Sequence, residues 1–367
     1  MFSSGRLIIL LAFFLAVCST AHAQTSADKE IAAKYAPVLH QAVGEHPRGD
    51  YPTNFNFDGD WNGTNNWANC ENTKFKLLGY VYYALSETST HYFITYAVFH
   101  ARDYKGGEKK GVILSDLLRQ AGDIAKDAGK PDTILSEAAI AHENDMEGAL
   151  VIVEKTSGKV IGLETLHHNE FGRFTPEASE KDLDGHFKLV GDHVELYIEP
   201  KGHGIEAWGT EGPHPEKGSL LYNYAGRADD PEKATDGKVG YDLLPIATTL
   251  WPKARTAGSN TTFADFKNFG SVTISLASGA TAVTKKVVLG SLASAFDGKV
   301  GGINMARPPW GWFSLAHKED PPGLWFFDPA KVVKRDFGLP DSFSVTYVKV
   351  PFWAATTAHS TARAGNK

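Results

Sequence analysis

The sequence is poor in cysteine and in clustered positive charge. It has two cysteines in 367 residues, Cys18 and Cys70, and Cys18 lies in the export signal described below, so we expect no internal disulfide framework. The formal net charge is −6, and lysine and arginine form no basic stripe, which argues against a nucleic-acid partner. No Gly-x-Ser-x-Gly nucleophile motif occurs either. Stability must come from core burial, with a bound ion as one further source.

Long apolar runs are also scarce. The one clear run, Leu7–Val17, is shorter than the about 20 residues that a membrane-spanning helix needs. Arg6 precedes it, and Ala21-His22-Ala23 follows it as a small-x-small cleavage pattern. We therefore expect residues 1–23 to be a signal peptide and the mature protein to be secreted or periplasmic after cleavage near Ala23, without a transmembrane segment.

Strand patterns dominate the rest of the chain. Two aromatic and β-branched runs, Lys76–Ser86 and His91–His100, flank a short polar turn and predict a hairpin. Helix patterns are fewer, and Pro37 should end or kink the first of them. Further strands are expected at Ala149–Glu154, His193–Glu199, Gly270–Leu276, Val283–Leu289 and Ser342–Val350, and helices at Asp28–Ala42, Gly111–Ala128 and Ser291–Phe296. These patterns predict a mainly β fold, an antiparallel β-sandwich with a few peripheral helices and long loop insertions.

No Pro, Gly or Ser-rich linker interrupts the middle of the chain. We therefore expect residues 24–354 to form a single domain. The small and polar residues 355–367 are expected to form a disordered tail.

The most informative segment is His142–Gly148 (HENDMEG), which runs directly into five apolar residues. Residues two apart along a strand point the same way, so Asp145 and Glu147 should share a face. Two carboxylates at the entrance of a core must be protonated, paired with a cation or bound to metal. A bend just upstream would bring the imidazole of His142 to the same point. The alternative is a strand entrance whose acids face solvent or pair with lysine and arginine.

This segment resembles the H-x-x-D-x-E core of the necrosis-inducing, ethylene-inducing peptide-like proteins. It is still more similar to the H-E-G-D-W-E form of their vacuolar-sorting-protein-like relatives. Lys34–Leu39 (KYAPVL) and Tyr197–Gly204 (YIEPKGHG) resemble other parts of that second group, and His91–Asp103 resembles an aromatic strand that ends in a metal-binding aspartate. The resemblance implies a metal set of Asp103, His142, Asp145 and Glu147, with His203 as a fifth candidate.

The sequence also departs from the toxic members of that family, which carry a G-H-R-H-D-W-E heptad. Ala141, Glu143, Asn144 and Met146 stand at four of its positions here. Metal binding tolerates those changes, whereas lysis of plant cells does not follow from what is left. The resemblance is confined to motifs between about residues 34 and 204, and it assigns no role to the chain beyond residue 205.

A second acidic segment lies in the loop Asn54–Asn69. Asp58, Asp60 and Asn62 reproduce the first half of an EF-hand loop, but Asn69 stands where the bidentate glutamate is required. The two interpretations are a partial cation loop and an Asx-rich turn that is stabilised by its own side chains.

Other segments admit two interpretations as well. His167 and His168, with Glu164 and Glu170 close in sequence, could assist a metal or a proton transfer, or form an ordinary surface pair. The tryptophan-rich segments Ala306–Trp312 and Pro321–Phe327 could form a rim that faces a glycan or membrane, or pack inside the fold.

Three functions fit these observations. The first is a secreted protein that contains a divalent metal, with Ca²⁺ or Mg²⁺ favoured over Mn²⁺ or Zn²⁺, and that binds a lipid headgroup or a glycan. The second is a secreted metal-dependent hydrolase, in which the ion activates water. In the third, the metal is purely structural. A catalytic site needs an open coordination position, and five candidate ligands are enough to close it, which favours binding over catalysis.

Overall fold

The structure is a computed structural model, and it describes residues 26–104, 141–181, 183–209, 219–255, 261–301 and 306–352. The expected signal peptide, the expected helix Gly111–Ala128 and the expected tail lie outside these residues. Within them, no helix is both long and apolar enough to cross a membrane.

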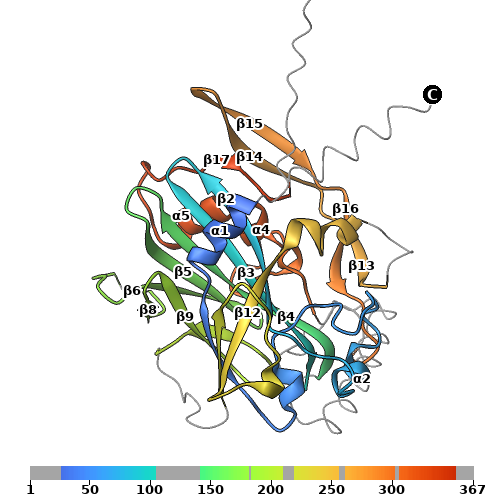
Figure 1. Cartoon of the computed structure of the whole chain (residues 1–367). Coiled ribbons are helices and arrows are strands. Elements are labelled where there is room, and N and C mark those ends of the chain that lie inside the picture. The colour runs from blue at the N-terminus through green and yellow to red at the C-terminus, as the bar shows by residue number, and fades with distance from the viewer. Residues whose placement is uncertain are drawn as a thin grey trace, which may run out of the picture.

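One large sheet contains most of the described strands (Figure 1). Its main strands are β1 (Val38–Ala42), β2 (Tyr80–Thr88), β3 (His91–Asp103), β4 (His142–Glu154), β5 (Lys159–His167), β6 (Glu170–Pro176), β7 (His186–Phe187), β9 (His193–Ile198), β10 (Ile205–Ala207), β11 (Ser219–Tyr224) and β12 (Lys238–Pro245). Their spatial order is β10-β9-β1-β11-β12-β2-β3-β4-β5-β6-β7. The remaining strands are β8 (Leu189–Val190), β14 (Ser271–Ser278), β15 (Thr281–Val288) and β17 (Thr346–Lys349), which attach to this sheet, and β13 (Phe263–Asn268) and β16 (Ser291–Phe296), which pair with each other.

The prediction of a mainly β fold is confirmed, but the prediction of an antiparallel sandwich is not. β1 pairs with β9, β11 with β12, and β12 with β2, all in parallel. The sheet also curls until β10 lies beside β5, so that it nearly closes into a barrel. Parallel neighbours such as Val38 and Glu195 are far apart in the sequence. Parallel strands are not joined by a short turn, so the turn residues on which the prediction relied do not mark such pairs.

Two apolar cores lie on the two faces of the curved sheet. One contains side chains from most of the strands that form the curl, such as Val98, Val151 and Leu196. The other lies between the opposite face of β2–β4 and the segments that follow β12, and includes Trp310 and Phe326. The tryptophan-rich segments thus contribute largely to packing.

The helices are short and peripheral. They are α1 (Ser26–Lys34), α2 (Asn66–Cys70), α4 (Leu324–Phe327), α5 (Pro329–Asp336) and the 3₁₀ turns η1 (Pro47–Asp50), η3 (Pro231–Lys233), η4 (Ile246–Thr248), η5 (Trp251–Arg255) and η6 (Pro309–Gly311). The helix expected over Asp28–Ala42 ends before Pro37, and β1 takes up its second half. The helix expected at Ser291–Phe296 is wrong: this segment is β16, whose small side chains lie against β13 in an antiparallel pair.

The centre of the sheet is the β2–β3–β4 meander. The predicted hairpin is confirmed, since β2 and β3 pair antiparallel through Tyr82 and Ala97. β3 and β4 pair over almost their whole length, from His91 opposite Glu154 to Asp103 opposite His142. β4 is therefore longer than the strand predicted at Ala149–Glu154, and the HENDMEG segment lies inside it.

Candidate functional site

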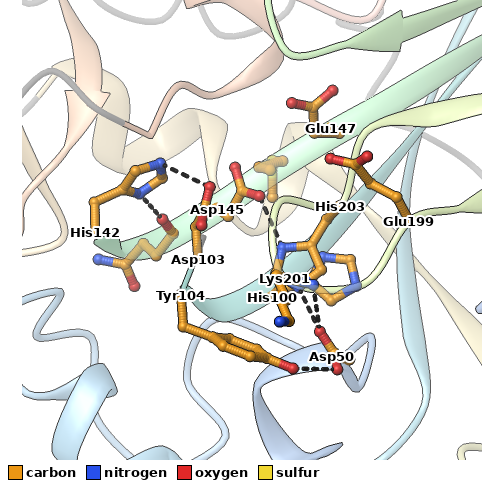
Figure 2. Close-up of polar contacts among 12 residues, drawn as sticks. Asp50, His100, Asp103, Tyr104, His142, Asp145, Glu147, Glu199, Lys201 and His203 are labelled. Atoms are coloured by element: carbon orange, nitrogen blue, oxygen red, sulfur yellow. Dashed lines mark hydrogen bonds and ion pairs between the residues drawn. The ribbon is translucent and has the colours of Figure 1, made fainter. Parts of the chain in front are cut away.

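The ends of β3 and β4 bring four predicted ligands to one small cavity. Asp103 ends β3 opposite His142, which begins β4, and Asp145 and Glu147 follow along β4. Each of the four residues is between 3% and 6% exposed, and all of them line a cavity of about 30 Å³. A space of this size is large enough for a water molecule or an ion, since a water needs about 10–15 Å³. Figure 2 shows Asp103, His142 and Asp145 close together, with Glu147 beyond them.

A local bend explains how His142 and Asp145 line the same cavity. Three residues apart on a regular strand, they would point to opposite faces. Asn144 between them has φ 61°, a conformation that asparagine tolerates better than most residues. Its side chain donates to the carbonyl oxygens of Gly63 (2.9 Å) and Asp297 (2.8 Å) and accepts from Asn66 Nδ2 (2.7 Å). Contacts to three distant segments therefore hold the bend.

The bend also fixes the tautomer of His142. Its Nδ1 lies 2.7 Å from the carbonyl oxygen of Asn144, and this nitrogen must donate because a carbonyl oxygen only accepts. Nε2 lies 3.6 Å from Asp103 Oδ2. A ring that donates through one nitrogen to a backbone carbonyl and presents the other nitrogen to carboxylates is arranged as metal-binding histidines are.

His203, the fifth candidate, does not line the cavity but holds one of its acids. Its Nδ1 lies 2.9 Å from Asp145 Oδ2 and its Nε2 lies 3.3 Å from Asp50 Oδ1. Burial alone would lower the pKa of His203, but the hydrogen bonds to these two carboxylates raise it to about 10. Both ring nitrogens are therefore engaged by carboxylates, and the ring positions Asp145.

Asp50 anchors this network and was not found from the sequence. One of its oxygens accepts from the backbone N–H of Gly44 (2.7 Å) and the hydroxyl of Tyr104 (2.6 Å), and the other accepts from the N–H of Lys201 (2.8 Å). His100 stacks on His203 with ring centroids 3.7 Å apart. Burial and the charge of His203 keep the pKa of His100 well below its usual value. No sequence pattern links Asp50 to His203, because they lie 153 residues apart.

Two acids in the cavity have opposite electrostatic environments. Burial would raise the pKa of Asp145, but its hydrogen bond from His203 lowers it below the usual value. Burial raises the pKa of Glu147 to about 7, although the backbone N–H of His168 donates to both of its oxygens (3.0 and 2.9 Å). Arg307 also lines the cavity. Three carboxylates and one imidazole nitrogen form an oxygen-rich donor set that suits a divalent cation.

The third acid of the HENDMEG segment has a different role. Glu143 accepts hydrogen bonds from the backbone N–H groups of Trp67 (2.8 Å) and Lys299 (2.7 Å). It therefore ties β4 to two loops and does not line the cavity. Asn144, with its φ of 61°, lies between Glu143 and the two acids that line the cavity.

The acidic loop uses its side chains on itself. Asp58 Oδ1 accepts from the N–H of Asp60 (3.1 Å), Asp60 Oδ1 from the N–H of Asn62 (2.7 Å), and Asn62 Oδ1 from the N–H of Thr64 (3.1 Å). These are successive Asx turns. The geometry is that of a turn that its own side chains stabilise.

A larger groove adjoins the small cavity, with a volume of about 1330 Å³. Trp312 lines both spaces, and its Nε1 donates to the carbonyl oxygen of Met146 (2.9 Å). The indole packs on Gly148, where a Cβ atom would come within 2.4 Å of the ring. The groove is rich in aromatic and charged side chains, among them Phe171, Phe313, Trp325, Glu170, Asp184 and Glu206.

Comparisons with known proteins add a distant likeness. No family model and no curated protein matches the chain. Similar solved structures include the protein NLPPya in complex with mannosamine, at 16% identity and a TM-score of 0.29 over 50% of this chain and 68% of that one. Another is necrosis and ethylene inducing protein 2 from the causal agent of cocoa's witches' broom disease, at 15% and 0.27 over 58% and 72%. A non-toxic necrosis-inducing-like protein, HaNLP3, matches at 13% and 0.30 over 61% and 76%.

These structures are necrosis-inducing proteins, the first of the two groups that the sequence motifs resemble. The similarity to vacuolar-sorting-like proteins stays a prediction from the motifs. At such identities and TM-scores, the likeness says nothing about what this chain binds.

Proposed function

We propose that this is a secreted protein that holds one divalent metal ion in the cavity formed by Asp103, His142, Asp145 and Glu147. The observation that carries the proposal is that three buried carboxylates and one imidazole, whose Nε2 faces Asp103, line a single space of about 30 Å³. Buried acids of this density need a compensating cation. A bound ion supplies it, and it would also compensate Glu147, whose pKa burial raises to about 7.

The donor set favours Ca²⁺ or Mg²⁺ over Mn²⁺ or Zn²⁺, because hard ions prefer carboxylate oxygen. Asp145 and Asp50 engage both ring nitrogens of His203, so we count four ligands rather than five. Six or more positions surround Ca²⁺ and six surround Mg²⁺. Coordination positions are thus left for water or for the oxygen atoms of a ligand. From the sequence, we expected five protein ligands to close the site.

The groove beside the cavity favours a glycan as that ligand. Ligand sites combine apolar and aromatic walls with a few polar groups, and Trp312 joins the groove to the cavity. Sugar rings can stack on such indole and phenyl faces while their hydroxyl groups complete the coordination of the metal. Six acids, among them Glu170 and Glu206, and three lysine or arginine residues line the groove. This excess of acids further favours a sugar that carries an ammonium group, because opposite charges attract across the interface.

The proposal is tested by measuring ligand binding with and without metal. Residues 24–367 are screened against neutral and amino-sugar oligosaccharides, in Ca²⁺, in Mg²⁺ and in EDTA, beside vesicles with zwitterionic and anionic headgroups. We expect binding to amino-sugar glycans that EDTA abolishes. The Asp145→Asn variant should fail to bind in any buffer, whereas Asp60→Asn, in the acidic loop, should bind normally.

Two outcomes would contradict this function. Binding to vesicles alone would move the ligand from glycan to lipid headgroup. Glycan binding that is equally strong in EDTA would remove the metal from recognition.

A further inference from the structure

Two adjacent histidines meet at the end of β5. His167 is the last residue of this strand, and His168 opens the short turn to β6. Neighbouring side chains on a strand point to opposite faces. His168, however, has φ 61°, and the turn brings the two rings together with centroids 4.6 Å apart. The sequence paired these histidines with Glu164 and Glu170, but the structure gives them another partner.

That partner is Glu199, which follows the end of β9. One of its oxygens lies 2.8 Å from His168 Nε2, and the other lies 3.6 Å from His167 Nε2. The three residues can each offer one ligand atom within 4.8 Å of the others. Two imidazole nitrogens and a carboxylate oxygen are thus gathered around one point, at the seam where the curved sheet nearly closes.

The outer nitrogen of each ring also faces a carboxylate. His167 Nδ1 lies 3.4 Å from Glu206 Oε1, and His168 Nδ1 lies 3.6 Å from Glu147 Oε1. Metal-binding histidines commonly carry such a carboxylate on their second nitrogen, which fixes the tautomer and orients the ring. Both histidines therefore direct Nε2 inward and Nδ1 toward an acid. A surface pair with no function does not require this double arrangement.

We infer that His167, His168 and Glu199 form a second metal site, next to the cavity of Asp103, His142, Asp145 and Glu147, which His168 also lines, and that this second site takes a borderline ion such as Zn²⁺. Imidazole donors suit Zn²⁺, and two histidines with one glutamate are a donor set that leaves the fourth tetrahedral position open. His167 lines the large groove and its side chain is 35% exposed. The open position therefore faces the groove, where a water molecule or a ligand oxygen can complete the coordination.

The site would also join two parts of the sheet. His167 and His168 belong to the β5–β6 turn, whereas Glu199 belongs to the loop between β9 and β10. β9 and β10 lie at one end of the strand order, and β5 comes near its other end. An ion bound by the β5–β6 turn and the β9–β10 loop would link these two parts of the sheet. Zn²⁺ should therefore raise the melting temperature, as any ligand of the native state does.

The test is a Zn²⁺ titration of residues 24–367 in excess Mg²⁺, which keeps the cavity of Asp145 occupied. We expect the wild type to take up about one equivalent of Zn²⁺ and to melt at a higher temperature with it. His167→Ala and Glu199→Gln should lose this equivalent. Glu206→Gln, which removes only the outer carboxylate, should weaken affinity by about 10-fold to 100-fold. His168→Ala is avoided because the imidazole of His168 also faces Glu147 and lines the small cavity.

Two controls keep this site distinct from the first. His317→Ala removes another histidine of the same groove, which faces the single acid Glu319, and it should bind Zn²⁺ as the wild type does. Asp145→Asn should lose the metal of the small cavity but retain the Zn²⁺ site. The visible absorption of bound Co²⁺ offers a second readout, since Co²⁺ in a tetrahedral site absorbs more strongly than Co²⁺ in an octahedral oxygen site.

The inference is overturned if the folded wild type takes up no Zn²⁺, or if His167→Ala and Glu199→Gln bind it unchanged. Loss of Zn²⁺ in Asp145→Asn alone would place the ion in the small cavity and overturn the second site as well. The first site is judged separately by its Ca²⁺ or Mg²⁺ content.

Discussion

The two halves of β4 are equally buried but are held in different ways. His142 to Val153 form twelve consecutive buried residues. Beyond Gly148 they are apolar and pack into the two cores, as Leu150 and Val151 do. Before Gly148 they are mostly polar, and side chains from distant loops hold them, among them His203 for Asp145 and Asn66 for Asn144.

This contrast shows that burial alone does not separate a core from a site. The apolar half is stabilised by contacts that many sequences could supply. The polar half carries buried charge that destabilises the fold unless it is compensated, and a bend that a regular strand would not adopt. Such features are retained where a function requires them. Substitutions in the two halves should therefore affect different properties.

The largest effect on stability is expected in the apolar half. Leu150→Ala deletes a fully buried side chain and should reduce the free energy of unfolding by about 2–5 kcal/mol, because a cavity remains. Urea denaturation measures this loss. The variant that stays folded should keep its metal content, since Leu150 does not line the small cavity. A loss below about 1 kcal/mol, or a parallel loss of metal, would contradict the division of β4 into two halves.

A pH-dependent gain in the free energy of unfolding is expected when an acid beside the apolar half is replaced. Glu164 on β5 pairs opposite Leu150 and accepts from the indole N–H of Trp325. Burial raises its pKa from the ordinary 4.5 to about 8. The native state thus keeps this proton to a higher pH than the unfolded state, and the stability that Glu164 contributes falls as pH rises from about 4.5 to about 8.

Glu164→Gln should remove this dependence. Near pH 8 the variant should be more stable than the wild type by about 4 kcal/mol, and near pH 4 the two should be similar. Chemical denaturation across this pH range measures the difference. A wild type whose stability does not fall toward pH 8 more than that of the variant would show that the acid is ionised or solvated in the native state.

The smallest effect is expected in the acidic loop, which resembles the polar half only in composition. Asp60 is exposed and accepts from the backbone N–H of Asn62, an interaction that an asparagine oxygen can also make. Asp60→Asn should change the free energy of unfolding by less than about 0.5 kcal/mol. It should leave the metal content unchanged. A clear loss of bound Ca²⁺ in this variant would restore the loop as a cation site.

The sequence predicted those features that depend on neighbouring residues. Alternation and turn residues located the β2–β3 hairpin, Pro37 marked the end of α1, and the spacing of Asp145 and Glu147 placed both acids on one face. The parallel strand pairs could not be predicted, because they join segments such as residues 38–41 and 195–198 with no local signal. Ser291–Phe296 was assigned to a helix because its small residues tolerate both states, and only the pairing with β13 decides for a strand.

The candidate site shows the same limit. Its four cavity residues were chosen from motifs, with a bend expected before Asp145. The residue that bends, Asn144, is held by side chains and carbonyls from residues 63, 66 and 297. The roles of His203 and Asp50 depend on a contact between segments about 150 residues apart. Periodicity carries no information about such contacts.

The most direct test of this account is the metal content of residues 24–367, purified without chelator and measured by elemental mass spectrometry beside Asp145→Asn and Asp60→Asn. We expect about one equivalent of Ca²⁺ or Mg²⁺ in the wild type and in Asp60→Asn. We expect none in folded Asp145→Asn, because the substitution removes the negative charge and one of the two carboxylate oxygens. A wild type without either ion, or an Asp145→Asn variant that retains its ion, would contradict the metal site at the polar half of β4.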